Sequence, residues 1–224
     1  MIFTETKLKG AYIIDIEKLE DERGFFARSF CQKEFESHGL NPRLVQCNIS
    51  FNLKKGTLRG IHYQVAPHEE AKLVRCVRGS IYDVIIDIRP DSETYCQWIG
   101  VELGIFSLQL TAHSSQSVSS SCHLPSPIFS PSSNRSELTA HCLPGLANSS
   151  QLTAQYRMLY IPEGFAHGYL TLEDDTEIFY QMSQFYAPES ARGVRWNDPA
   201  FNIQWPIEVQ VISERDKTYP DFRP

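Results

Sequence analysis

The chain has 224 residues, of which 42% are hydrophobic and 21% are charged, a composition typical of a single folded domain. Its formal net charge is −6 and no block of lysine or arginine stands out, which argues against a nucleic-acid-binding surface. The first residues lack the apolar run of a signal peptide, and no stretch has the roughly 18 apolar residues of a membrane-spanning helix. We therefore expect a cytoplasmic protein without a membrane partner.

Six cysteines are scattered along the chain without a Cys-x-x-Cys pair. This spacing argues against a zinc ribbon or a redox motif. In a reducing compartment we expect free thiols that fill small spaces in the fold. The cysteines are Cys31, Cys47, Cys76, Cys96, Cys122 and Cys142.

Short apolar or alternating stretches, separated by glycine and proline, dominate the sequence before residue 105 and after residue 156. This texture is typical of a sheet-rich domain, and many short strands predict a β-sandwich or barrel. One early helix is expected from Gln32 to His38, closed by Gly39. The expected strands are residues 11–16, 43–47, 72–77, 81–88, 97–103, 158–161, 169–172, 177–182 and 207–212.

Residues 105–151 differ from the rest because they are rich in Ser, Pro, Leu and Asn and carry almost no charge. This composition predicts a surface loop or a disordered segment. The tripeptide Leu-Thr-Ala recurs at 110–112, 138–140 and 152–154, which suggests a duplicated or accidentally translated insertion. A loop of this length is otherwise rare unless it is a lid. We therefore predict one domain spanning residues 1–224, interrupted by an inserted loop.

The segment RGIHYQ at residues 59–64, followed by Lys72, brings an imidazole, a guanidinium and an ammonium into one neighbourhood. If this segment is a strand, alternation sends Gly60, His62 and Gln64 to one face. Imidazole titrates near neutral pH, so a histidine on the interior face of a small barrel can act as a general base. Taken alone, His62 also fits a hydrogen-bonded core residue, which is the commoner case.

A second histidine, His167, follows a turn formed by Pro162, Glu163 and Gly164. Two histidines in two matching segments suggest a metal-binding cupin. Such a site normally needs a His-x-His pair with a carboxylate, and the partner of His62 is Gln64, a poor ligand. We therefore expect no metal.

Downstream, phenols at Tyr180 and Tyr186 and a carboxylate at Asp216 are weak signals individually, since tyrosines are common in sheets. Together the segments resemble the dTDP-4-dehydrorhamnose 3,5-epimerase family over essentially the whole chain except residues 105–151. The resembling segments are 21–26 (DERGFF), 45–50 (VQCNIS), 56–64 (GTLRGIHYQ), 71–74 (AKLV), 83–89 (DVIIDIR), 161–168 (IPEGFAHG), 195–199 (RWNDP) and 212–216 (ISERD).

This resemblance implies a cupin-type jelly roll, a homodimer, and an isomerase that needs neither metal nor cofactor. The implied reaction is epimerisation at C3 and C5 of a nucleoside-diphosphate 4-keto-6-deoxy sugar, of the type that converts dTDP-4-dehydro-6-deoxyglucose to dTDP-4-dehydrorhamnose. A proton next to a ketone can be removed only when the enolate oxygen is stabilised. The site therefore needs a base, a partner for the oxyanion and an acid on the opposite face.

The resemblance also implies the roles of individual residues. His62 is the base and Asp216 orients it, Lys72 faces the oxyanion, and Tyr180 returns a proton from the other face. Guanidinium groups suit phosphate oxygens, so arginines are expected at the diphosphate. The substrate-binding residues implied are Arg23, Arg59 and Arg215 at the diphosphate, Gln46, Asn48 and Tyr186 around the nucleoside and sugar, and His167.

One departure from the family pattern concerns the nucleobase. Arg28 stands where many members carry a glutamate that contacts the base, so a base other than thymine is a hypothesis. The alternative functions are an epimerase acting at one centre, a ketoisomerase of a related nucleotide sugar, and a non-catalytic protein that binds sugar nucleotides. A metal-dependent cupin isomerase or dioxygenase is the remaining alternative, which Gln64 disfavours.

Overall fold

The computed structural model describes residues 1–105 and 154–223, where nearly all regular structure is β-strand. The two helices there, α1 (Gln32–Ser37) and α2 (Glu214–Lys217), are short, and neither is long and apolar enough to cross a membrane. The prediction of an all-β fold is confirmed. The strands described are β1 (Ile2–Glu5), β2 (Tyr12–Asp15), β3 (Lys18–Asp21), β4 (Gly24–Ala27), β5 (Gln46–Asn52), β6 (Thr57–Gln64), β7 (Lys72–Arg78), β8 (Ser80–Asp87), β9 (Trp98–Ile105), β10 (Ala154–Gln155), β11 (Met158–Ile161), β12 (Phe165–Thr171), β13 (Thr176–Met182), β14 (Ala191–Gly193) and β15 (Val211–Ile212).

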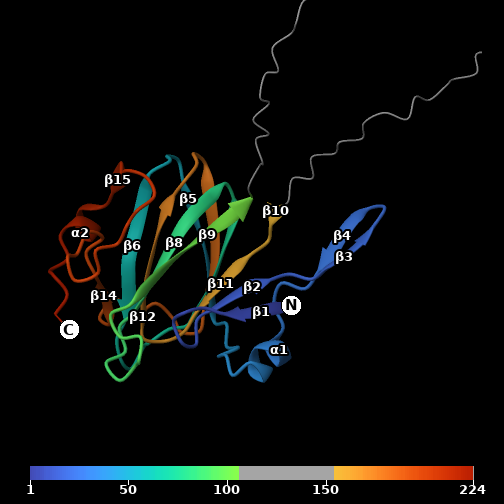
Figure 1. The fold of residues 1–224 in the computed structure, drawn as a ribbon, viewed down its shortest axis with the longest axis horizontal. Coiled ribbons are helices and arrows are strands. Elements are labelled where there is room, and N and C mark those ends of the chain that lie inside the picture. Colours follow the sequence, from blue (N-terminus) through green and yellow to red (C-terminus); the bar gives the residue numbers. More distant parts are fainter. Residues whose placement is uncertain (106–153, 224) are drawn as a thin grey trace, which may run out of the picture. The chain divides into compact units, whose positions relative to one another are not determined.

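Two sheets form a sandwich of the jelly-roll type (Figure 1). One sheet has six strands in the order β1–β2–β11–β7–β13–β5. The other has seven, in the order β10–β9–β8–β12–β6–β14, with β15 beside β6. Strands from before and after the undescribed residues 106–153 are therefore neighbours in each sheet, and the two parts of the chain build one core.

Aliphatic and aromatic side chains fill the space between the sheets. In β8, Ile81 and Ile85 are fully buried against Val74 of β7, while Val84 and Ile86 enter a second cluster on the outer face. Full burial of each such side chain contributes roughly 1.5–3 kcal/mol. Because both faces of β8 are covered, its sequence is almost continuously apolar instead of alternating.

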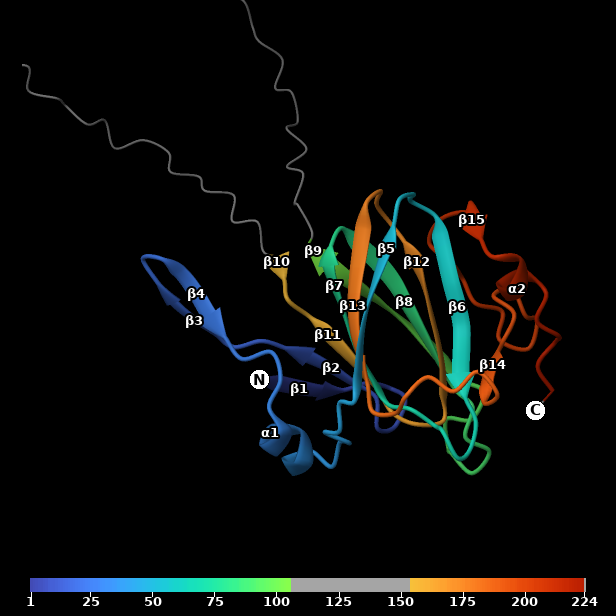
Figure 2. The ribbon, with the colours of Figure 1, turned by 180° about the vertical axis from the view of Figure 1, so that it is seen from behind.

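Each sheet has a cover on its outer face. Phe35 of α1 is fully buried and packs edge-on against Tyr160 of β11, with ring centroids 5.8 Å apart. After α1, Gly39 takes a φ of +70°, the left-handed conformation that favours glycine at a helix end. The chain after β14 covers the seven-stranded sheet with Phe201 and Ile203, and Figure 2 shows this C-terminal segment beside β6 and β14.

The β3–β4 hairpin is a separate two-stranded sheet that stands apart from the sandwich (Figure 1). Leu19 and Phe26 are directly opposite each other on it, and both are largely exposed. An isolated two-stranded hairpin is marginally stable in water, and exposed apolar side chains mark a contact surface. On this hairpin Phe25 packs on Tyr156, while Leu19 and Phe26 stay open to solvent.

The strand β6 is irregular where it meets β12. His62 lies opposite His167 and Arg59 lies opposite Tyr169, so two residues of β6 face Gly168 alone. This is a β-bulge, which bends the strand and re-aims its side chains. The backbones come very close at this point because Gly168 has no side chain.

The bulge changes which side chains share a face. Strict alternation puts Arg59 and His62 on opposite faces of β6. With the extra residue between them, both line the same cavity, together with Gln64. The predicted sharing of a face by His62 and Gln64 is confirmed, and Arg59 joins them.

Three expected strands have other bounds. The strand expected at 169–172 already begins at Phe165. The strand expected at 43–47 begins at Gln46, because the proline at position 42 and the following loop carry the chain up to the edge of β13. The strand expected at 207–212 is limited to Val211–Ile212, because its neighbour β6 begins only at Thr57 and offers no strand beside residues 207–210. Strands β1, β3, β4, β10 and β14 were not expected.

The predicted insertion at 105–151 lies outside the described residues, except for Ile105 at the end of β9. The strands on either side of the undescribed segment are paired: Ala154 lies opposite Ile105 and Gln155 lies opposite Gly104. The segment therefore leaves and re-enters the sandwich at neighbouring positions of one sheet.

The cysteines of the described ranges are free thiols, as predicted. Burial raises the pKa of Cys76 to about 12, so it stays protonated at neutral pH. Cys122 and Cys142 lie outside the described residues.

We predict that Gly60→Ala destabilises the fold because β6 and β12 touch at this residue. A Cβ at Gly60 would lie 2.5 Å from Cα of Gly168 and 2.9 Å from the carbonyl oxygen of His167. Gly24→Ala is the matched control, since Gly24 has the same φ of +123° and its Cβ would meet nothing within 4 Å. Both variants carry the strain of alanine at positive φ, so the difference isolates the clash.

We expect Gly60→Ala to lose at least about 2 kcal/mol more free energy of unfolding than Gly24→Ala. Urea denaturation of both variants measures this difference. Equal losses would contradict the contact between the two backbones.

Candidate active site

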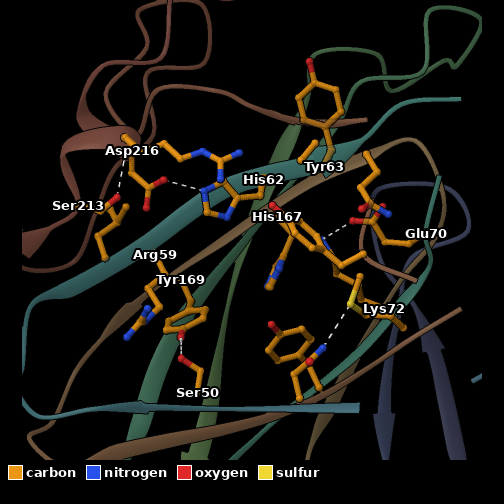
Figure 3. Close-up of a pocket in the computed structure, with 18 of the residues that line it drawn as sticks. Ser50, Arg59, His62, Tyr63, Glu70, Lys72, His167, Tyr169, Ser213 and Asp216 are labelled. Atoms are coloured by element: carbon orange, nitrogen blue, oxygen red, sulfur yellow. Dashed lines mark hydrogen bonds and ion pairs between the residues drawn. The ribbon is translucent and has the colours of Figure 1, made fainter. Parts of the chain in front are cut away.

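A cavity of about 840 Å³ opens between the two sheets. Its walls come from β5, β7 and β13 of one sheet, from β6, β12 and β14 of the other, and from α2 (Figure 3). Ten of the twelve residues predicted as catalytic or substrate-binding line it: His62, Lys72, Tyr180, Asp216, Arg59, Gln46, Asn48, His167, Tyr186 and Arg215.

His62 and Asp216 form a close pair at this cavity, with 2.7 Å between His62 Nε2 and Asp216 Oδ1 (Figure 3). The Asp216 side chain is 6% exposed and that of His62 is 42% exposed, so the ring stands between the carboxylate and the open space. Burial opposes ionisation of Asp216, but hydrogen bonds from His62 and from the Gly60 amide outweigh it and bring its pKa below the ordinary value.

The ionised carboxylate fixes which nitrogen of His62 is basic. A carboxylate only accepts hydrogen bonds, so Nε2 carries the hydrogen that faces Asp216. In the neutral ring, Nδ1 is then the nitrogen with a free lone pair. The pair therefore presents one defined basic atom.

The short helix α2 brings Asp216 to His62. Ser213 caps the helix, and its Oγ accepts a hydrogen bond from the Asp216 amide at 3.1 Å. Immediately before the cap, β15 runs parallel to the start of β6, with Ile212 opposite Leu58. The segment 212–216 is thus held beside the strand that carries His62.

Lys72 is the first residue of β7 and is paired with Glu70. The distance from Lys72 Nζ to Glu70 Oε1 is 2.8 Å, and both side chains are buried. A buried ammonium requires a partner of opposite charge, which Glu70 provides. Glu70 was not among the predicted residues, although an acidic residue two positions before a buried lysine is a signal that the sequence contains.

Tyr180 projects from β13, where its neighbours across the sheet are Asn48 and Val74. Burial raises the pKa of the Tyr180 phenol above its ordinary value, and the charge of Arg59 opposes this rise only in part. The phenol therefore remains protonated at neutral pH and is available as a proton donor.

Polar contacts fix the wall between β5, β6 and β12. Arg59 Nε donates to Asn52 Oδ1 at 2.7 Å, and its other nitrogens make no hydrogen bond within the described residues. Tyr169 and Ser50 join their hydroxyl groups at 2.8 Å. Arg59 is therefore oriented by one nitrogen, which leaves its outer fork free.

Gln64 anchors the loops that precede β7 and follow β13. Its Nε2 donates to the carbonyl oxygens of His68 at 2.8 Å and Phe185 at 3.2 Å, and its Oε1 accepts from the Ala187 amide at 2.6 Å. Tyr186 lies within the second loop, and its amide donates to Gln46 Oε1 at 3.1 Å. Gln64 thus works as a clamp for the loop that carries Tyr186.

The lining of the cavity is cationic although the chain is acidic. Arg59, Lys72, Arg192 and Arg215 face it, against the two carboxylates Glu70 and Asp216. Such an excess of cations suits an anionic ligand such as a diphosphate. Arg192 on β14 was not predicted, because nothing in the sequence distinguishes it from a surface arginine.

His167 contacts a buried carboxylate that was also missed. Its Nε2 lies 2.7 Å from Asp83 Oδ1, but the angle between the two groups does not suit a hydrogen bond. The two side chains are in close polar contact. Asp83 is fully buried and interrupts an otherwise apolar strand, which is the signal in the sequence that a buried partner exists.

The residues present do not resemble a metal site. Within residues 1–105 and 154–223, no group of three or more His, Cys, Asp or Glu side chains is arranged to hold a metal ion. The side-chain amide of Gln64 is hydrogen-bonded to the two loops. That the reaction needs no metal stays a prediction, supported by this donor chemistry.

Arg23 and Arg28 are the two predicted residues that the structure does not bring to the cavity. Arg23 lies at the turn of the β3–β4 hairpin, is 84% exposed and pairs with Asp21. Arg28 follows the hairpin, is 62% exposed and pairs with Glu34 of α1. Within one copy of the chain, neither arginine contributes to the site.

The chain is similar to known sugar-nucleotide epimerases. The family model described as dTDP-4-dehydrorhamnose 3,5-epimerase matches residues 5–110 and 146–224. The dTDP-4-dehydrorhamnose 3,5-epimerase of Methanothermobacter thermautotrophicus is 34% identical over 99% of this chain and 94% of its own length.

Solved structures give the same result. The enzyme of that name from Elizabethkingia anophelis has a TM-score of 0.74 at 32% identity, covering 99% of this chain and 96% of that one. The dTDP-6-deoxy-D-glucose-3,5-epimerase of Legionella pneumophila, crystallised with dTDP-4-keto-L-rhamnose, has a TM-score of 0.69 at 29% identity and covers 100% of this chain and 99% of its own. The chain belongs to the dTDP-4-dehydrorhamnose 3,5-epimerase family.

Proposed function

We propose that this chain epimerises C3 and C5 of dTDP-4-dehydro-6-deoxyglucose to give dTDP-4-dehydrorhamnose. The observation that carries the proposal is the convergence of an oriented base, a protonated phenol and an ammonium on one cavity, in the form of His62, Tyr180 and Lys72. A protein that only binds sugar nucleotides has no need of an acid and a base. The Legionella relative, crystallised with dTDP-4-keto-L-rhamnose, supports this substrate class.

Each inversion consists of two proton transfers on opposite faces of one carbon. His62 Nδ1 removes the proton next to the C4 ketone, and Asp216 stabilises the imidazolium that forms. The electron pair moves to the C4 oxygen, where the ammonium of Lys72 stabilises the enolate. Tyr180 donates its proton to the opposite face as the ketone re-forms. His62 then releases its proton to solvent and the Tyr180 phenolate takes one up, which restores both groups.

The cationic lining holds the nucleotide in this proposal. The outer forks of Arg59 and Arg215 bind the diphosphate, and Arg192 adds a third cation. Gln46, Asn48 and His167 contact the sugar and nucleoside, and Tyr186 stacks on the base. Arg28 pairs with Glu34 and gives no support to a base other than thymine. Tighter binding of CDP or GDP than of dTDP would contradict thymine as the base.

The functional unit in this proposal is a homodimer in which the β3–β4 hairpin of one copy reaches the cavity of the other. Two observations support it: the hairpin exposes Leu19 and Phe26, and Arg23 at its tip lies outside the cavity of its own chain. In a two-fold symmetric dimer, one interface places the hairpin of each copy against the other copy. Arg23 then supplies a cation to the partner's diphosphate.

The first test is proton exchange in deuterated water with dTDP-4-dehydro-6-deoxyglucose, followed by NMR. The wild-type protein should exchange the protons on both C3 and C5. His62→Ala should lose at least roughly a hundredfold in rate at both carbons. Tyr180→Phe should still exchange protons through His62 but should form little inverted product, because the opposite-face donor is gone.

Tyr82→Phe is the matched control, since Tyr82 packs on Trp205 outside the cavity and should behave as wild type. Exchange at one carbon would indicate an epimerase acting at a single centre. No exchange by folded, dimeric wild-type protein would contradict the proposal.

The raised pKa of Tyr180 predicts the pH dependence of its contribution. Burial keeps the phenol protonated through its ordinary pKa of about 10, so its role as donor is intact at pH 7 and at pH 9. The ratio of wild-type to Tyr180→Phe epimerisation rates should therefore be the same at these two pH values. A ratio that falls toward one at pH 9 would mean that the phenol ionises earlier and would contradict this assignment.

Exchange of subunits tests the shared site. Arg23→Ala and His62→Ala should each be nearly inactive as pure dimers. In a mixed dimer, the intact body of the Arg23→Ala chain receives the intact hairpin of the His62→Ala chain, so one of the two sites is complete. Random reassociation should restore up to about a quarter of wild-type activity. No recovery, with mixed dimers detected by native mass spectrometry, would contradict a hairpin that crosses to the partner.

The pairing of β9 with β10 makes the insertion removable in this proposal. Replacing residues 106–153 by Asn-Gly should join Ile105 to Ala154 through a two-residue hairpin turn. We expect the shortened protein to fold and to keep its kcat, because every residue proposed to act on the substrate lies in the described ranges and is kept. Measurement of solubility and activity checks this; a folded protein that has lost activity would favour a lid.

A further inference from the structure

The buried pair of Glu70 and Lys72 contains an acceptor that the mechanism above does not use. Glu70 Oε1 is occupied by the ammonium of Lys72 at 2.8 Å. The second oxygen, Oε2, is buried and has no hydrogen-bond partner among the described residues. The whole side chain is only 4% exposed. A buried carboxylate oxygen without a donor is unfavourable, because the hydrogen bonds lost from water are not replaced.

Two donors of the cavity, Gln64 and His62, have other partners. The amide of Gln64 donates to two carbonyl oxygens, and Nε2 of His62 faces Asp216. Figure 3 shows Glu70 and Lys72 on the same side of the cavity, with the His62–Asp216 pair on the other. No described residue donates to Oε2, and Glu70 lines the cavity, so a hydroxyl of a molecule bound beside Lys72 would supply the donor that this oxygen lacks.

The chemistry of a 4-keto-6-deoxy sugar supplies such a donor. Of the two carbons that flank the ketone, C5 carries the ring oxygen and the methyl group, and only C3 carries a hydroxyl. When Lys72 binds the C4 oxygen, the neighbouring C3 hydroxyl comes next to the carboxylate that pairs with Lys72. The ketone and hydroxyl thus match an ammonium and a carboxylate that are themselves neighbours.

We propose that Glu70 binds the C3 hydroxyl of the sugar through Oε2 and makes the site selective for a 3-hydroxy over a 3-deoxy sugar. This inference rests on the proposed epimerase function. The negative charge of Glu70 does not oppose the enolate, because Lys72 lies between them and balances it. A hydroxyl held by a buried acceptor is discriminated strongly, since its absence leaves the acceptor unsatisfied.

The test compares two substrates, dTDP-4-dehydro-6-deoxyglucose and its 3-deoxy analogue, by the rate of exchange at C5, a proton that both possess. Wild-type protein should lose at least roughly tenfold in kcat/KM with the 3-deoxy sugar. Glu70→Ala should treat the two substrates alike to within about threefold, whatever its overall activity. Glu70→Gln, which keeps the shape of the side chain and a polar group, should give an intermediate ratio.

The ratio separates a substrate contact from a merely structural role. If Glu70 only balances the charge of Lys72, its removal slows both substrates by the same factor and the ratio stays as in wild type, which would overturn the inference. Ser50→Ala is the control for a change in the cavity wall and should keep the wild-type ratio, because the Ser50 hydroxyl bonds to Tyr169. Wild-type protein that does not discriminate would also overturn the inference. Wild-type protein without exchange on either substrate would instead contradict the proposed function.

Discussion

The close contact between β6 and β12 determines the geometry of the site. Two backbones without intervening side chains meet at Gly60 and Gly168, and the bulge that results turns Arg59 and His62 toward the same cavity. The other edge of β6 pairs with β14 and β15. β15 pairs with β6, and α2 follows β15 directly. The strand that carries His62 therefore also holds Asp216 in place. The base, its orienting carboxylate and a cation thus depend on one strand and its neighbours.

The environment sets the protonation states of the proposed acid and of the carboxylate that orients the proposed base. Hydrogen bonds lower the pKa of Asp216 despite its burial, so the carboxylate stays ionised behind His62. Burial raises the pKa of Tyr180, so the phenol stays protonated. The proposed transfers need a base held by an ionised carboxylate and a protonated phenol as the acid. The two sheets supply them from opposite walls, which suits proton transfer on opposite faces of a sugar carbon.

A single copy of the chain leaves two parts of the molecule without a partner. The β3–β4 hairpin exposes apolar side chains, and its arginine is outside the cavity. Glu70 keeps a buried acceptor that no described group satisfies. In the two proposals above, a second copy covers the hairpin and the C3 hydroxyl of the sugar donates to Glu70. In this view the hairpin and Glu70 are the two features whose contacts binding completes.

The amino-acid sequence determined the all-β class and most strands, because alternating and apolar runs between glycines and prolines are local signals. It also singled out His62, Lys72, Tyr180 and Asp216 through their resemblance to the family, and all four line one cavity. In the sequence, Glu70 and Asp83 stand out only as an acidic residue near a lysine and an acidic residue within an apolar strand. Only the tertiary structure decided that Arg59 shares a face with His62, that Gln64 clamps the Tyr186 loop, and that Arg23 stands outside its own cavity. These facts depend on strand pairing between residues more than a hundred positions apart, and no local pattern encodes which strands become neighbours.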